Sequence, residues 1–373
     1  MTLRREILKA MALTGLTATG LSMAPGLLAG QASKARKPLK ILFLGGTGFL
    51  GPHTVRAAQA RGHQVTLFNR GKTNPGLFAD LETIQGDRHT DDINQLRDRR
   101  WDAVIDTSSY FPRAVSSALS VLADNIDQYL LVSTISVYRD FARPGMDESA
   151  PLATLTDPDT EEVTGESYGP LKALCEQAAR ESLPDRSTII RPGLIVGPGD
   201  KTDRFTWWPV RIKKGGEVLA PGSGDDFIQF IDVRDLGEWM VHCAENRIPG
   251  TFNAQSRAGD RTMADLLTGC QAALNPDARL TWVPGSFLAR RNVAPWTEMP
   301  VWLPPDGDYA GVGQLSSEKA YAHGLGERKM ADTIEDTWHW FAGLPADRRD
   351  KLRAGIAPDK EQQVLAAWHR QQS

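Results

Sequence analysis

The most constraining feature of this chain is a glycine-rich turn between an apolar run and a stretch with helical character. The turn reads Gly-Gly-Thr-Gly-Phe-Leu-Gly over residues 45–51, directly after Ile-Leu-Phe-Leu over residues 41–44. Glycines spaced as Gly45, Gly48 and Gly51 permit a tight strand-to-helix turn, close approach of a pyrophosphate, and close packing of helix on strand. The free N–H groups of the new helix face the same phosphates. The pattern predicts a dinucleotide site; the alternative is an ordinary glycine turn in an α/β core.

Apolar and helical segments alternate after this turn and predict a parallel sheet with right-handed crossovers. The expected strands are 39–44, 64–68, 81–85, 103–106, 129–133 and 187–190, and the expected helices are 49–61, 91–99, 113–122 and 168–182. We therefore expect an α/β fold, a Rossmann-type doubly wound parallel sheet over residues 39–190. Residues 191–373 should form mostly a smaller mixed α/β substrate-binding region, with some segments returning to the first domain.

The first 32 residues predict a signal peptide rather than part of the fold. Arg4 and Arg5 precede a weakly apolar stretch that ends in small residues, which is the order of a charged region, an apolar region and a cleavage site. The arginine pair resembles the twin-arginine export signal. Glycines, threonines and a proline make a spanning helix unfavourable there. We expect a linker over residues 33–38, passage through the twin-arginine machinery, a periplasmic or secreted location, and no membrane span in the mature chain.

Charge and cysteine content exclude several classes of function. The net charge is −3 and the pI about 6.2, so there is no general electrostatic reason to bind nucleic acid. Cys175, Cys243 and Cys270 form neither a disulfide framework nor a metal-ligand spacing, and buried free thiols are expected. No metal site is predicted.

The ends of the expected strands supply the other cofactor contacts. The second strand ends at Asn69 and Arg70, where an acidic residue would hold the ribose 2′-hydroxyl of NAD. Arg70 instead suits a 2′-phosphate, so the sequence favours NADP over NAD. Asp87, after the third strand, could accept from the adenine amino group, and Thr107 and Ser108 should pass beside the cofactor after the fourth.

Tyr168 and Lys172 stand four residues apart at the start of an expected helix and therefore share one of its faces. A tyrosine that serves as general acid/base near neutral pH needs a lowered phenol pKa, and a neighbouring cation supplies this by favouring the phenolate. The same lysine can hold the ribose hydroxyls of a cofactor. Between the fifth strand and this helix, residues 140–166 contain three prolines and, from Asp147 to Glu166, seven acids without a base. They predict a solvated loop or a flap over the site.

Three further motifs establish a family resemblance. The chain reads Ser-Thr-Ile-Ser-Val-Tyr over residues 133–138, Arg-Pro-Gly over 191–193 and Phe-Ile-Asp-Val-Arg-Asp over 230–235. With the glycine turn and the Tyr168/Lys172 pair, in this order, they resemble the extended short-chain dehydrogenase/reductases, the NAD-dependent epimerase/dehydratase family. The resemblance spans residues 39–255 and implies that the chain is an enzyme of this superfamily.

The resemblance assigns roles to individual residues. It implies Tyr168 as acid/base, Lys172 as its partner, and Thr134 as the hydroxyl that polarises the substrate oxygen. Members that remove water from sugar nucleotides carry acidic residues directly after this threonine, but Ile135 and Ser136 stand here. A 4,6-dehydratase is therefore disfavoured. A homodimer is common in the family.

The expected site combines the residues predicted from their positions in the sequence with those that the family resemblance implies. The expected cofactor contacts are Gly45, Thr47, Gly48, Phe49, Leu50, Gly51, Asn69, Arg70, Asp87, Thr107, Ser108, Ser133, Tyr168, Lys172, Arg191 and Pro192. The substrate contacts expected from position alone are Ser108, Tyr110, Trp207 and Trp208.

Three functions fit this sequence. The first is an NAD(P)-dependent epimerase, isomerase or oxidoreductase that acts on a sugar-like or other alcohol or carbonyl substrate by hydride transfer. An exported enzyme finds little free NADP to exchange, so a retained cofactor and a redox-neutral cycle are expected. The second is an NADPH-dependent carbonyl reductase similar to isoflavone reductases. The third is a non-catalytic nucleotide- or RNA-binding protein on the same fold, which the complete catalytic set argues against.

Overall fold

The computed structural model describes residues 37–157 and 160–373 of the chain. The predicted signal peptide and most of the predicted linker lie outside the described residues, so export stays a prediction. The central sheet has seven parallel strands in the order β10-β6-β5-β4-β1-β2-β3. Its strands are β1 Lys40–Leu44, β2 Gln64–Asn69, β3 Glu82–Gln85, β4 Trp101–Asp106, β5 Ile126–Val132, β6 Ser187–Pro192 and β10 Gly250–Ala254.

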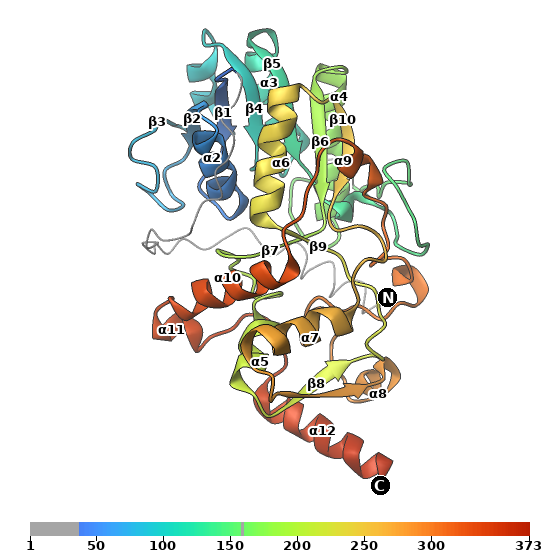
Figure 1. Cartoon of the computed structure of the whole chain (residues 1–373). Helices are drawn as coiled ribbons and strands as arrows, with labels where there is room; N and C mark the ends of the chain where they lie inside the picture. Colours follow the sequence, from blue (N-terminus) through green and yellow to red (C-terminus); the bar gives the residue numbers. More distant parts are fainter. Residues whose placement is uncertain (1–36, 158–159) are drawn as a thin grey trace.

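Helices cover both faces of this sheet, which confirms the expected doubly wound α/β fold (Figure 1). On β1, Ile41 and Phe43 belong to one buried cluster, whereas Leu42 and Leu44 belong to another, because successive strand side chains point to opposite faces. The first cluster packs under α2 (Leu50–Ala60) and α6 (Val233–Asn246), and the second under α3 (Pro112–Leu122) and α4 (Tyr168–Ser182). Burial on both sides explains why the strands are apolar runs rather than alternating ones.

A smaller mixed region lies beyond the carboxyl ends of the strands, in the lower half of Figure 1. It contains two short parallel pairs, β7 (Leu194–Val196) with β9 (Phe230–Asp232), and β8 (Glu217–Pro221) with β11 (Arg279–Val283). Its other elements are α5 Trp207–Lys214, α7 Met263–Leu274, α8 Gly285–Arg290, α10 Met330–Ala342, α11 Ala346–Arg349 and α12 Pro358–Gln372. β10, α6 and α9 (Glu318–Ala322) return to the central sheet and its covering layer.

Two segments differ from expectation. The helix expected over residues 91–99 is shorter, a 3-10 helix over Asp91–Leu96, and the Thr90 side chain caps it by accepting from the Asp92 backbone N–H. The segment after β5 is not simply a solvated flap, because Phe141 and Met146 are buried in the core of the smaller region. Phe141 N donates to the carbonyl oxygen of Asp308 at 2.9 Å, so burial and main-chain pairing hold this stretch in place.

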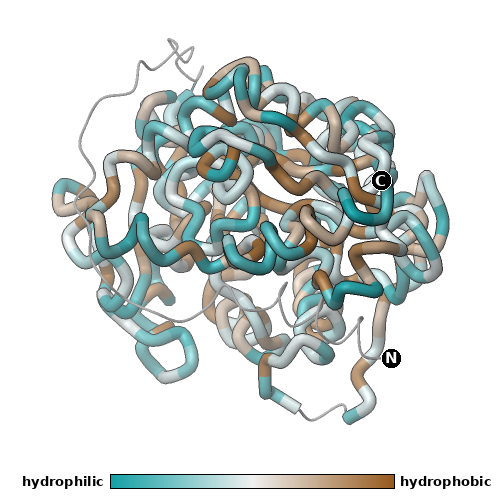
Figure 2. Tube along the Cα trace, turned by 90° about the horizontal axis from the view of Figure 1, so that it is seen from below, coloured by the Kyte–Doolittle hydropathy of each residue, from teal (hydrophilic) through white to brown (hydrophobic). Residues whose placement is uncertain are grey.

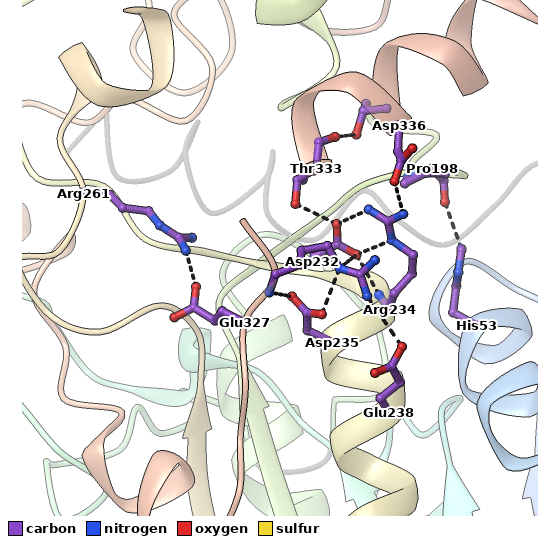
Figure 3. Close-up of polar contacts among 12 residues, drawn as sticks. His53, Pro198, Asp232, Arg234, Asp235, Glu238, Arg261, Glu327, Thr333 and Asp336 are labelled. Carbon is purple, nitrogen blue, oxygen red and sulfur yellow. Dashed lines mark hydrogen bonds and ion pairs between the residues drawn. The ribbon is translucent and has the colours of Figure 1, made fainter. Parts of the chain in front are cut away.

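A buried ionic network joins the sheet to the smaller region (Figure 3). Asp232 ends β9 and caps α6 by accepting from the Arg234 backbone N–H at 2.9 Å. Its carboxylate also accepts from the Arg234 side chain and from the Thr333 hydroxyl of α10, while Arg234 forms an ion pair with Asp336. Arg328 donates to Asp235 at 2.8 Å in the same cluster. The network fixes the start of α6 against α10.

Hydrophobic and hydrophilic segments are distributed as in other globular α/β proteins. Hydrophobic segments run mainly through the interior, and hydrophilic ones dominate the rim (Figure 2). The three cysteines are free and buried, as expected. Within residues 37–157 and 160–373, no helix is long and apolar enough to cross a membrane, and no His, Cys, Asp and Glu cluster could hold a metal ion.

Candidate functional site

The glycine turn leads from β1 into α2, and its three spaced glycines occupy three different environments. Gly45 has φ +108°, and a Cβ there would lie 2.7 Å from the Thr107 hydroxyl. A Cβ on Gly51 would lie 2.5 Å from the carbonyl carbon of Gly46, which leaves no room for a side chain. Gly48 has nothing within 4 Å of its Cβ position and lines a cavity. The turn therefore offers open backbone at the N-terminus of α2, which fits the pyrophosphate of a dinucleotide.

Two asparagines hold this turn in shape. The Asn69 side chain, at the end of β2, donates to the carbonyl oxygen of Gly45 at 3.2 Å and accepts from the Gly71 N–H at 2.8 Å. Asn74 donates to the carbonyl oxygen of Thr47 at 2.8 Å. Asn69 is thus a support of the turn, whereas its neighbour Arg70 is exposed at the strand end. An exposed cation at this place is compatible with a 2′-phosphate.

The edge beside β4 contains a buried ion pair that sequence reasoning missed. The Arg88 guanidinium donates to both carboxylate oxygens of Asp106, at 2.7 and 2.8 Å. Arg88 and the Ser109 and Tyr129 hydroxyls hold the pKa of Asp106 at about 2 despite its burial. No sequence signal distinguished Arg88 from other loop arginines. The predicted contact Asp87 accepts from the His89 backbone N–H and takes no part in this ion pair.

The three side chains of the Thr-Ser-Ser segment that follows β4 differ in whether they line the cavity. Thr107 lines the cavity and Ser109 does so too. The Ser108 hydroxyl instead donates to the carbonyl oxygen of Leu44 at 3.1 Å and does not line the cavity. The side chain of Ser108, a predicted substrate contact, is therefore bound to the end of β1, and Ser109 is the serine that lines the cavity.

The predicted catalytic trio meets in this cavity, which has a volume of about 280 Å³. Tyr168 and Lys172 come from the first turn of α4, and Thr134 from the end of β5. Lys172 is 4% exposed, and its Nζ donates to the carbonyl oxygens of Ser109 at 2.7 Å and Val132 at 2.5 Å. The Tyr110 ring lies 6.5 Å from the Tyr168 ring, so this predicted substrate contact does line the cavity.

The electrostatics of the trio differ from the expectation. Burial raises the pKa of Tyr168 well above its ordinary value, while a hydrogen bond from Thr134 and the charge of Arg204 act in the opposite direction. Burial also lowers the pKa of Lys172. The expected lowering of the phenol pKa by Lys172 is therefore not found, because the lysine ammonium is directed at two backbone carbonyls. A raised pKa favours the neutral form of the Tyr168 phenol, which can donate a proton.

The Ser133–Glu176–Arg191 cluster lies behind the trio. Glu176 is fully buried and accepts from Arg191 Nε at 2.9 Å and Nη2 at 2.6 Å, and from the Ser133 hydroxyl at 2.6 Å. Arg191 does not line the cavity, although Ser133 and Pro192 do. The guanidinium of Arg191, a predicted cofactor contact, pairs with the buried Glu176 beneath the site instead of lining the cavity.

The two predicted tryptophan contacts also lie away from the cavity. Trp208 is fully buried and donates from its indole N–H to the carbonyl oxygen of Pro300 at 2.7 Å. Trp207 packs against it with ring centroids 4.5 Å apart and belongs to the same core. These two residues were predicted as substrate contacts from their position in the chain alone, and both are instead buried in the hydrophobic core. The polar and aromatic residues that line the cavity and were not predicted include Asp200, Thr202, Arg204, Gln229, Gln255 and Trp296.

A histidine connects α2 to the turn over residues 197–200. His53 on α2 lies within hydrogen-bond distance of the carbonyl oxygen of Pro198, Nε2 to oxygen 2.9 Å (Figure 3). Burial lowers its pKa to about 4, so the neutral ring donates at physiological pH. Gly199, next in the turn, would place a Cβ 3.4 Å from Phe49. The turn over residues 197–200, which leads to Asp200 and Arg204, is thereby held against α2.

Comparison with known proteins agrees with this geometry. Residues 41–254 match the model of the NAD dependent epimerase/dehydratase family. The chain is 27% identical over 261 residues to the bovine (Bos taurus) epimerase family protein SDR39U1, covering 64% of this chain and 82% of the relative. It is 28% identical over 361 residues to a UDP-glucose 4-epimerase of Neisseria meningitidis, covering 82% and 98%.

Solved structures share the fold. The UDP-glucuronic acid 4-epimerase of Bacillus cereus, determined in complex with NAD, superposes with a TM-score of 0.59 at 16% identity. The superposition covers 82% of this chain and 99% of that one. The likeness thus extends past residue 254, through most of the smaller region, as a likeness of fold.

Proposed function

This chain belongs to the NAD dependent epimerase/dehydratase family, and we propose that it is an NAD(P)-dependent epimerase or isomerase of a sugar-like alcohol. The observation that carries the proposal is the convergence of Thr134, Tyr168 and Lys172 in one cavity with the open backbone of Gly48. A bound nicotinamide cofactor would supply the acceptor and donor of hydride. The glycine turn and the N-terminus of α2 would hold its phosphates.

The residues of the trio have separable tasks in this proposal. Thr134 donates a hydrogen bond to the substrate oxygen and orients it toward Tyr168. The Tyr168 phenolate accepts the hydroxyl proton when the alcohol is oxidised, and the phenol returns it when the carbonyl is reduced. The buried Lys172 ammonium is directed at backbone carbonyls, and a bound ribose would bring hydroxyl groups to it. Because burial raises the pKa of Tyr168, the cationic charges around the cavity must favour the phenolate for oxidation to begin.

We propose NADP as the preferred cofactor and a redox-neutral cycle in which the same cofactor is reused. Arg70 supports the first point by placing an exposed cation where β2 ends. The proposed export supports the second, because a chain that leaves the cell folded would keep the cofactor it loaded. Nucleotide released by denaturing the purified protein, identified by mass and absorbance, tests both points.

Turnover distinguishes an epimerase from a reductase and from a binding protein. The epimerase should interconvert substrate stereoisomers without added reductant, and retain the substrate deuterium placed on the reacting carbon. Tyr168→Phe should abolish turnover and keep the cofactor. Consumption of one NADPH per turnover would instead establish a carbonyl reductase. A wild-type protein that binds nucleotide and turns over no sugar, with Tyr168→Phe indistinguishable from it, would establish a binding protein.

A further inference from the structure

A buried carboxylate at the end of β4 collects hydrogen bonds from several parts of the chain. Asp106 is the last residue of β4, is fully buried and is not among the residues that line the cavity. The Arg88 guanidinium donates to both of its oxygens, and the Ser108 backbone N–H donates to Oδ1 at 3.0 Å. The hydroxyls of Ser109 and Tyr129 each donate to Oδ2 at 2.5 Å. These donors use the full hydrogen-bonding capacity of a carboxylate.

This carboxylate sets the course of the backbone where the chain leaves the sheet. An aspartate that accepts from the backbone N–H two residues later closes a tight turn, and the bond between Asp106 and Ser108 has this form. The hydroxyl of Ser109, three residues after Asp106, ties the turn to the same carboxylate a second time. The direction of the Ser109 carbonyl group therefore depends on Asp106.

The Ser109 carbonyl oxygen is one of two acceptors that hold the ammonium of Lys172. Lys172 Nζ donates to it at 2.7 Å and to the carbonyl oxygen of Val132 at 2.5 Å. Val132 belongs to β5 and is placed by the sheet, whereas Ser109 lies in the loop after β4 and is placed by Asp106. A short path thus leads from the buried carboxylate through Ser109 to the lysine in the cavity.

Fold stability alone does not account for a charge at the end of β4. Burial of an ion pair carries a desolvation penalty that well-packed apolar residues avoid. Residues 103–105 of the same strand are apolar and fully buried. The Asp106 carboxylate, however, can accept from the Ser109 hydroxyl, which an apolar side chain cannot do. Arg88 keeps the carboxylate ionised, because its charge offsets the effect of burial and holds the pKa of Asp106 at about 2.

We propose that Asp106 is a positioning residue that, through Ser109, places the Lys172 ammonium where it would receive the ribose of a bound cofactor. The inference rests on the proposed function, because it concerns the lysine that would bind this ribose. It adds to that function a residue outside the cavity that controls cofactor affinity. A site that depends on the exact place of a side chain needs such support from the residues behind it.

Two variants, each of which removes one hydroxyl from Asp106, form a matched pair for the test. Ser109→Ala removes the hydroxyl on the path to Lys172. Tyr129→Phe removes a hydroxyl at the same distance from Oδ2, but Tyr129 belongs to the core beneath α3 and α4 and does not line the cavity. Both variants keep the ion pair with Arg88. Both should lower the melting temperature, because each takes one donor from the same buried oxygen.

Fluorescence titration of the full chain with NADPH and with NADH measures cofactor affinity. We expect Ser109→Ala to weaken binding of the preferred nucleotide about three- to tenfold, and Tyr129→Phe to bind it as the wild type does. Asp106→Asn combined with Arg88→Met, which leaves no buried charge unpaired, should weaken binding at least as much as Ser109→Ala. An unchanged affinity in Ser109→Ala, or an equal loss in Tyr129→Phe, overturns the proposal.

NMR spectroscopy of the full chain with ¹³Cε-labelled lysine observes Lys172 without cofactor or turnover. The Lys172 signal is the one missing from Lys172→Met, and it should move in Ser109→Ala and stay in place in Tyr129→Phe. A signal that stays in place in Ser109→Ala overturns the proposal even if affinity falls, because the hydroxyl would then act on the cofactor directly. A wild-type protein that binds neither nucleotide, or epimerises nothing, refutes the proposed function, whereas the lysine signals still decide the positioning.

Discussion

Lys172 Nζ lies 2.7 Å from the carbonyl oxygen of Ser109, so this lysine of α4 is tied to the segment that follows β4. A second bond, to the carbonyl oxygen of Val132, ties it to the end of β5. The ammonium therefore stands at the carboxyl edge of two neighbouring strands, where ligands of open α/β sheets bind. Its position depends on the backbone and not on the tyrosine.

We expect Lys172→Met to reduce turnover by about two orders of magnitude or more, because the cationic charge and the donor for a cofactor ribose are both lost. Affinity for NADP should also fall. Steady-state kinetics and a fluorescence titration with NADPH measure the two effects. Tyr168→Phe is the matched control, since it should lose turnover and keep its cofactor affinity. Full cofactor affinity in Lys172→Met would refute the role of this lysine in cofactor binding.

Gly48→Ala and Gly45→Ala should separate cofactor binding from folding. Gly48 has open space around its Cβ position, so alanine should leave the melting temperature within a few degrees of the wild type and weaken nucleotide binding about tenfold or more. Gly45→Ala should lower the melting temperature instead, because φ is +108° and the added carbon meets Thr107. Thermal melts with and without NADP provide the measurement. The assignment fails if Gly48→Ala binds NADP as well as the wild type does.

His53 predicts an acid-dependent loss of stability. Its pKa is about 4 in the folded protein and 6.5 as the ordinary value, so folding favours the neutral ring. The stability that this ring contributes is complete above pH 6.5 and falls as the pH decreases toward 4, because the unfolded chain then binds a proton that the folded chain does not. The loss approaches roughly 3 kcal/mol at most.

Urea denaturation between pH 7.5 and 4 of the wild type and of His53→Gln measures this effect. Glutamine keeps an N–H donor for Pro198 and removes the titration, so the variant should show the shallower pH dependence. Identical pH profiles of the two proteins would contradict the burial of a neutral imidazole at this position.

Glu176→Gln should strongly destabilise the protein, because it leaves the buried Arg191 without its counter-charge. Removal of one partner of such a pair costs about 3–5 kcal/mol. Glu161→Gln breaks the exposed pair with Arg113 and should change the stability only marginally, because solvent screens exposed charges. Chemical denaturation measures both variants. A cost for Glu176→Gln no greater than that for Glu161→Gln would show that the buried pair is not essential to the fold.

Local pattern was sufficient for much of the fold. Apolar runs of four to six residues predicted most of the strands of the main sheet, and the helix expected over residues 168–182 has those bounds. Gly45, Gly48 and Gly51 were found because their spacing is a short-range property. The helix expected over residues 91–99 ends earlier than predicted, as a 3-10 helix over Asp91–Leu96 that Thr90 caps. The burial of Phe141 and Met146 was not predicted either, because the prediction for this segment depended on its charge and proline content.

Long-range partners decide which of the predicted site residues line the cavity. Tyr168 and Lys172 were predicted from their spacing and Thr134 from the family resemblance, and the fold brings all three to one cavity. Arg191 looked like a cofactor contact until its partner, Glu176, was known, although only fifteen residues separate them in the chain. Charge alone could not show which of the many arginines faces the cavity.

By itself, the sequence determined the glycine turn and the parallel sheet, because each depends on residues that are close in the chain or on short apolar runs. It predicted Tyr168 and Lys172 from their spacing, and the family resemblance added Thr134. Only the tertiary structure decided what surrounds the trio. Gln255, Trp296 and Arg204 come from loops far apart in sequence, and the C-terminal segment holds the last two in place through Asp203 and Thr297. Burial and hydrogen-bond orientation at such a site are properties of the packed chain, since each depends on partners 26 to 145 residues away.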